Sequence, residues 1–207
     1  MRKSTILVLV AALGVAAPVR AQIDPDPDSC GIYFDEGATE FCTSQSQGGQ
    51  QTAYLCLTRT AAAAGVAFWE AAVEVSDPAT VLAWSLRGAG TNALAPPQFA
   101  FTPDTPLPWQ SSLVVLEVTV EILTPHPLAF RVRPLDTPSV PPAPYALPAY
   151  EPADDPGNLR TLGYSFGLEA GTGEPHWCAV INSHDDCAGD PTAEAATSWG
   201  RVKGLYR

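Results

Sequence analysis

Among the sequence motifs of this chain, the one around Ser165 indicates the most specific chemistry. Gly163-Tyr164-Ser165-Phe166-Gly167 matches the Gly-x-Ser-x-Gly elbow of α/β-hydrolases, whose serine attacks an acyl carbon. That elbow needs a strand before the serine and a helix after it. Glycines and Pro175 follow the motif and oppose a helix. We therefore interpret Ser165 as part of a strand, and a secreted hydrolase that uses it is the alternative function.

Two acidic clusters carry the oxygen ligands that hard cations prefer. Asp185, Asp186 and Asp190 follow one another closely near the C-terminal end of the sequence, and Asp24, Asp26 and Asp28 alternate with proline. Neither cluster has the D-x-D-x-D-G spacing of a calcium loop. We predict solvated acidic loops and no cofactor, with calcium as the one cation that the clusters suit.

Aromatic side chains are the other candidates for ligand contact. Trp109 lies in Pro106-Leu-Pro-Trp-Gln110, a segment whose prolines favour an exposed loop. An exposed indole can stack on a ligand such as a sugar ring. Trp109 is therefore the candidate stacking residue among the five tryptophans, while His126 and His176, each beside a proline, are predicted to be exposed turn residues.

The first 21 residues have the layout of a secretory signal peptide. Arg2 and Lys3 precede an apolar run from Ile6 to Ala17, and Val19-Arg20-Ala21 offers small residues to a signal peptidase. The apolar run is shorter than the roughly 20 residues that span a bilayer. We predict cleavage after Ala21, secretion or a periplasmic location, and no stable membrane insertion afterwards.

Five cysteines lie beyond this segment, where an oxidising compartment permits disulfides. Cys30 with Cys42, and Cys178 with Cys187, are close in sequence, so both pairs are predicted disulfides. Cys56 lies within an apolar strand pattern and is predicted to be a buried free thiol. A bridge from Cys56 to another cysteine stays open, because sequence does not determine connectivity.

The charge balance restricts the partners. Of the 11 basic residues, three lie in residues 1–21, which leaves 8 against 22 acidic residues and a net charge of −14 for residues 22–207. Such a surface repels phosphate backbones, so nucleic acid is excluded as a partner. A protein or a glycan at the cell surface is the partner class that remains.

Apolar residues at every second position dominate the rest of the chain. Residues 112–123 place Val114, Leu116, Val118, Val120 and Ile122 on one face, with Glu117 and Glu121 on the other. Residues 128–132 are predicted to return as an antiparallel partner of that strand. Further strands are predicted over 31–34, 52–59, 65–75, 80–86, 98–101, 159–168 and 177–181.

Residues 134–156 contain eight prolines, which predicts an extended surface connection or an edge segment. Trp199, Val202 and Leu205 recur at helical spacing after Ser198, which predicts a short C-terminal helix. The predicted fold is all-β. It is an antiparallel β-sandwich, immunoglobulin-like or jelly-roll-like, in which residues 22–207 form a single domain.

The two ends of the chain carry a family resemblance. Cys30-Gly-Ile-Tyr-Phe-Asp35 and Trp199-Gly-Arg-Val-Lys-Gly-Leu-Tyr-Arg207 are similar to the end signatures of uncharacterised exported bacterial β-sandwich proteins without assigned activity. The resemblance implies a bacterial envelope or extracellular setting and transfers no catalytic residue. The leading hypothesis is therefore a secreted, non-enzymatic protein with a binding, adhesion or surface-interaction role. A structural subunit of an envelope assembly is a further alternative.

Overall fold

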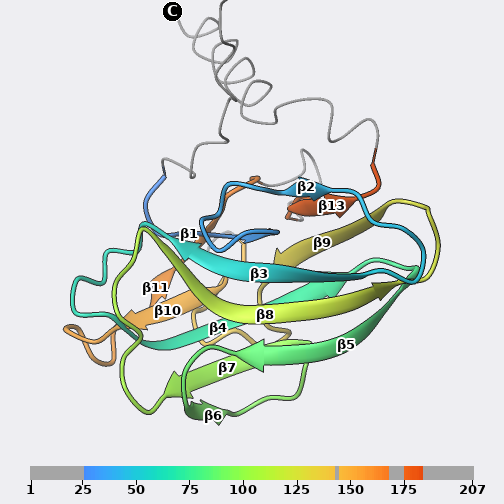
Figure 1. The fold of residues 1–207 in the computed structure, drawn as a ribbon. Coiled ribbons are helices and arrows are strands. Elements are labelled where there is room, and N and C mark those ends of the chain that lie inside the picture. The colour runs from blue at the N-terminus through green and yellow to red at the C-terminus, as the bar shows by residue number, and fades with distance from the viewer. Residues whose placement is uncertain (1–25, 143–144, 168–174, 184–207) are drawn as a thin grey trace, which may run out of the picture.

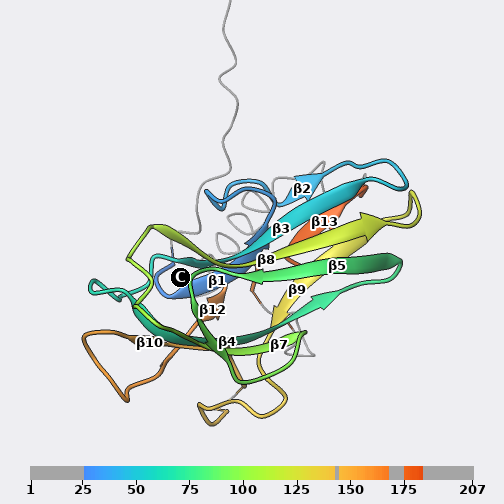
Figure 2. The ribbon, with the colours of Figure 1, turned by 60° about the horizontal axis from the view of Figure 1, so that its bottom comes forward.

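The computed structural model describes residues 26–142, 145–167 and 175–183, and these residues form two β-sheets that lie face to face (Figures 1 and 2). The first sheet has the order β12 (Gly163–Tyr164), β1 (Ser29–Tyr33), β3 (Gln50–Thr58), β8 (Ser112–Ile122) and β5 (Ala79–Leu86). The second has the order β11 (Arg160–Thr161), β10 (Ala149–Pro152), β4 (Val66–Val75), β9 (Leu128–Arg133), β13 (Ala179–Ile181) and β2 (Cys42–Thr43). β7 (Gln98–Pro103) pairs with β4 and with β6 (Gly90–Asn92).

The all-β prediction is confirmed for the described part of the chain, which contains no helix. Most strand pairs are antiparallel, but β1 with β12 and β2 with β13 are parallel, so both sheets are mixed. The strand predicted over 112–123 is an interior strand of the first sheet, where β8 pairs with β3 on one side and with the edge strand β5 on the other. Its period-two pattern buries Leu116, Val118, Val120 and Ile122 in the core as predicted. The placement of Val114 on that face is wrong, because the register with β3 shifts between Leu55 and Cys56, so that Val115 enters the core and Val114 packs with Cys56.

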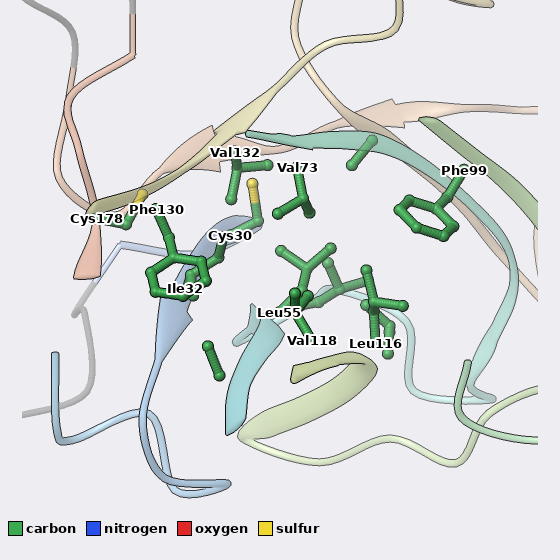
Figure 3. Close-up of a cluster of buried hydrophobic side chains, with 14 of the residues drawn as sticks. Cys30, Ile32, Leu55, Val73, Phe99, Leu116, Val118, Phe130, Val132 and Cys178 are labelled. Atoms are coloured by element: carbon green, nitrogen blue, oxygen red, sulfur yellow. The ribbon is translucent and has the colours of Figure 1, made fainter. Parts of the chain in front are cut away.

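Side chains from both sheets meet in one core (Figure 3). β1, β3 and β8 contribute Ile32, Leu55 and Leu116, while β4, β7 and β9 contribute Val73, Phe99 and Phe130. Phe34 meets Phe130 edge to face at 6.0 Å between ring centroids, which joins the β1 end to the facing sheet. Burial of this apolar surface is the main favourable term in folding.

The predicted pairing of residues 128–132 with the strand at 112–123 is wrong. After the turn at Pro125–Pro127 the chain crosses to the other sheet, where β9 pairs with β4 and β13. The register places Arg131 opposite Glu74 of β4, and their side chains form an ion pair at 2.8 Å. A second arginine, Arg133, lies 3.4 Å from the same carboxylate, so the cross-strand charges of β9 and β4 are matched.

The Pro-rich segment is more integrated than a surface connection. β10 lies within residues 134–156 and pairs with both β4 and β11, and its Tyr150 is fully buried. Pro152 stands at the end of β10, where the register with β4 shifts. Proline is tolerated at such irregular positions because no ladder hydrogen bond is lost there.

The predicted disulfides of Cys30 and Cys178 are wrong, because both residues are buried thiols. β1 directs Cys30 into the core between the sheets, whereas Cys42 lies on the edge strand β2 of the second sheet. Cys178 also belongs to the core, and its thiol donates to the carbonyl of His176 at 3.6 Å. Cys42 is in a disulfide, and its partner is not Cys30, Cys56 or Cys178. Cys187 is outside the described residues.

The prediction of a buried free thiol at Cys56 is confirmed. Its side chain does not enter the main core but packs with Tyr33 and Ala38 in a second, smaller cluster. Phe41 and Phe166 cover this cluster, with their rings 5.6 Å apart. Burial raises the pKa of the Cys56 thiol to about 12, so the neutral form persists at physiological pH.

Several predictions concern residues outside the described ranges. The signal peptide at 1–21, the acidic cluster of Asp185, Asp186 and Asp190, and the helix after Ser198 all lie there. Among the described residues, no helix is long and apolar enough to cross a membrane.

Candidate functional site

Ser165 lies in a turn directly after the two-residue strand β12. Its N–H donates to the carbonyl of Cys30 at 3.0 Å, and Gly167, at a φ of +75°, closes the turn back onto Tyr164. The Ser165 Oγ is buried and has no hydrogen-bond partner in the described part of the structure. A serine nucleophile needs a base within hydrogen-bond reach, and no described residue supplies one. The geometry around Ser165 is that of a packed turn.

The described histidines and aspartates do not converge. His126 and His176 are both exposed, as predicted, and no group of three potential metal ligands occurs among the described residues. Asp28 is engaged inside the protein, where its Oδ1 accepts hydrogen bonds from the N–H of Ala61 at 2.7 Å and from the hydroxyl of Tyr150. The part of the N-terminal acidic cluster that is described thus has a structural role.

The described tryptophans differ sharply in their surroundings. Trp69 is fully buried, and Trp84 packs against Phe99 with ring centroids 5.4 Å apart. Trp177 is covered by the guanidinium of Arg131, 4.8 Å from its ring centre. Trp109 alone among these four is largely open, with 52 % of its surface exposed. The sequence-based choice of Trp109 as an exposed aromatic is therefore confirmed for the described residues.

Trp109 is held in place by the loop that follows β3. Its indole Nε1–H donates to the carbonyl of Thr60 at 2.9 Å, and the N–H of Arg59 donates to the carbonyl of Ser111 at 3.0 Å. These two bonds tie the segment around Trp109 to the end of β3. An exposed ring that is already fixed loses little conformational freedom when a ligand stacks on it.

The preceding residues of the same loop are fixed to β4. Leu107 exchanges two backbone hydrogen bonds with Val66, both at 2.9 Å. Gly65 makes this approach possible, because its φ is +100° and a Cβ there would lie 2.5 Å from the carbonyl oxygen of Leu107. The close contact explains why glycine stands at the start of β4. The Trp109 loop is therefore tied to the second sheet as well as to β3.

Ala61, next to Thr60, is the centre of a polar network beneath the loop. Its N–H donates to Asp28 and to the Tyr150 hydroxyl at 3.1 Å, and its carbonyl accepts from Arg160 Nη1 at 2.9 Å. Burial, together with the bond to Asp28, raises the pKa of Tyr150 to about 12. Tyr150 therefore remains a neutral donor to Asp28 throughout the physiological range.

Arg160 is a cation anchored on the same segment after β3 that holds Trp109. It bonds the carbonyl of Ala61, and Trp109 bonds the carbonyl of Thr60, so the two side chains anchor on successive residues. Arg160 also pairs with Asp155 at 3.3 Å. Hydrogen bonds from Asn158 and Arg160 lower the pKa of Asp155 and keep it ionised. We call Trp109, Arg160 and Asp155 the Trp109 surface.

Sequence reasoning identified Trp109 but missed Arg160 and Asp155. They come from the β10–β11 region, which the sequence joins to Trp109 only through the fold. The dipeptide Pro156-Gly157 lies between the two residues and is typical of a turn, and Gly157 has a φ of +84°. No pattern in the sequence placed that turn beside the segment after β3.

The chain matches no protein-family model, and no curated protein shows significant similarity to it.

Proposed function

We propose that this protein is an exported, non-enzymatic binding module that engages a surface glycan or protein through the Trp109 surface. The observation that carries the proposal is the exposed indole of Trp109, which its own N–H fixes to the carbonyl of Thr60. The flat apolar ring offers stacking, and the Arg160–Asp155 ion pair, anchored on Ala61 next to Thr60, offers directional hydrogen bonds, a combination suited to a sugar ring. Export rests on the signal-peptide pattern of residues 1–21.

Thermal unfolding of the oxidised protein in the presence of oligosaccharides and peptidoglycan fragments tests this function. A ligand at about 100 times its Kd stabilises the folded state by about 2.7 kcal/mol, a clearly measurable shift. One glycan class that raises the unfolding temperature supports the proposal. If no glycan class raises the unfolding temperature, the binding role would be assigned to a protein partner.

An activity screen addresses the alternative of a secreted hydrolase. Esterase, glycosidase and protease substrates are offered to the wild-type protein and to Ser165→Ala. The proposal predicts no turnover by either protein. Turnover by the wild type that disappears in Ser165→Ala would overturn the non-enzymatic assignment.

A further inference from the structure

β5 forms an edge of the first sheet. It pairs with β8 on one side, and no described strand pairs with its other side. Its eight residues, Ala79–Leu86, include no charged side chain. Natural proteins commonly protect such edges with lysine or proline, because the unpaired N–H and C=O groups can accept another strand. β5 lacks both devices along its length.

The inner face of β5 is also incompletely covered. Val81 and Trp84 lie opposite Val120 and Val118 of β8, which are fully buried. Val81, Trp84 and Leu86 themselves are only partly buried, although they pack against the core. Figures 1 and 2 show β5 at the margin of its sheet. One added strand with apolar side chains on its inner face would complete the burial of Trp84 and Val81.

On the outer face of the sheet, the side chains of β5 are small and the side chains of β8 beside them are acidic. Thr80 and Ser85 are exposed on β5 and lie opposite Glu121 and Glu117 of β8. Glu117 already holds Arg87 at 2.7 Å, and no ion pair of Glu121 occurs in the described part. Adjacent strands are about 4.8 Å apart, so a lysine on an added strand would face Glu121 across about 10 Å. The extended side chains of the two residues together span that distance over the small Thr80.

We propose that β5 binds an extended segment of a partner protein in which apolar residues alternate with lysine or arginine. Main-chain hydrogen bonds to the β5 edge supply affinity, and the alternating side chains supply selectivity. The net charge of −11 favours a cationic partner at long range. A second copy of β5 fits less well, since it has no basic residue to offer.

The bulge in β5 favours the binding of one extended segment over pairing with the edge of a second sheet. The register with β8 shifts between Val81 and Ala83, which leaves Leu82 as the extra residue, 44 % exposed. A bulge bends and twists an edge, which hinders edge-to-edge pairing of two rigid sheets. One flexible segment can follow the twisted edge.

Peptide titration against the full chain tests this proposal. The probe is a peptide of about eight residues that alternates valine and lysine, and its charge control alternates valine and glutamate. Two further probes carry N-methyl groups on one or the other alternate set of amides. Binding through the edge predicts that only one of the two methylated peptides loses affinity, by about tenfold or more.

Protein variants separate this edge from the rest of the surface. Glu121→Gln is expected to weaken the lysine peptide several-fold, while Glu151→Gln on β10 and Trp109→Ala leave its affinity unchanged. The proposal is overturned if the lysine peptide does not bind or if both methylated peptides bind as the parent does. A concentration-dependent dimer of the protein that the peptide fails to dissociate would also overturn it, since a second copy would then occupy the edge.

Discussion

Glu70 of β4 is 1 % exposed, and its carboxylate accepts two hydrogen bonds from Ser139, one from the backbone N–H at 2.9 Å and one from the hydroxyl at 2.5 Å. In the alternation of β4, Glu70 falls on the face opposite Trp69 and Ala71. Ser139, from the Pro-rich segment, lies against that face. Two donors from one residue compensate the carboxylate for the water that it loses.

This contact predicts that Ser139→Ala destabilises the fold by about 1–3 kcal/mol, because the buried carboxylate loses one of its two donors. Urea unfolding measures the free energy, and hydrogen exchange over residues 134–142 reports whether the segment opens. Ser85→Ala, at an exposed strand position, is the control and should stay within about 0.5 kcal/mol of wild type. A Ser139→Ala variant as stable as that control would show that the contact contributes nothing.

The hydroxyl of Tyr150 predicts a loss of stability at alkaline pH. Its pKa is about 12 in the folded protein and about 10 in the unfolded chain. The unfolded state therefore loses this proton first. The contribution of Tyr150 is complete below pH 10 and declines by up to about 2–3 kcal/mol as the pH approaches 12.

Tyr150→Phe has no such proton to lose, so the difference in unfolding free energy between wild type and Tyr150→Phe should narrow from pH 9 to pH 12. The comparison is made between the two proteins because Cys56 and Cys178 also titrate above pH 9 in the unfolded state and affect both equally. A difference that stays constant over this range would contradict the assigned role of the hydroxyl.

Cys56 and Cys178 are predicted to resist alkylation in the native protein. Burial raises their pKa values to about 12 and about 11, from an ordinary value of 9.0. At pH 8 the thiolate fraction consequently falls about a thousandfold and about a hundredfold, and only the thiolate reacts. Iodoacetamide labelling followed by peptide mass spectrometry should show rapid modification in urea and almost none in buffer. Equal rates under both conditions would disprove the burial of these thiols.

The strands that alternate cleanly could be predicted from sequence because one residue in two is apolar over a long run. β8 and β5 follow the predicted ranges closely, and the inner face of β8 from Leu116 to Ile122 is buried as its pattern indicates, whereas the register shift before Leu116 exchanges Val114 for Val115. Sheet membership could not be predicted in the same way. Nothing local in residues 128–132 distinguishes β8 from β4 as a partner, and Glu74, which pairs with Arg131 in the fold, is more than 50 residues earlier in the chain.

The pairing of the cysteines could not be predicted from local sequence either. Short spacing in the sequence suggested the pairs Cys30–Cys42 and Cys178–Cys187, but β1 turns Cys30 into the core and so removes it from Cys42. Trp109 was found because the two prolines just before it, Pro106 and Pro108, mark an exposed loop. Arg160 and Asp155 come from a segment about 50 residues later, and only the fold anchors Arg160 on Ala61, next to the residue that holds Trp109.

Isothermal titration of the glycan identified by thermal unfolding, with wild type, Trp109→Ala and Tyr145→Ala, tests the central claim most directly. Tyr145 is the matched control because it is an equally exposed aromatic residue, at 51 % against 52 %. We predict that Trp109→Ala lowers the affinity about 30-fold or more, as expected for an anchor residue that contributes about 2 kcal/mol, while Tyr145→Ala binds as wild type does. Equal affinity of Trp109→Ala and wild type would contradict a binding role for the Trp109 surface.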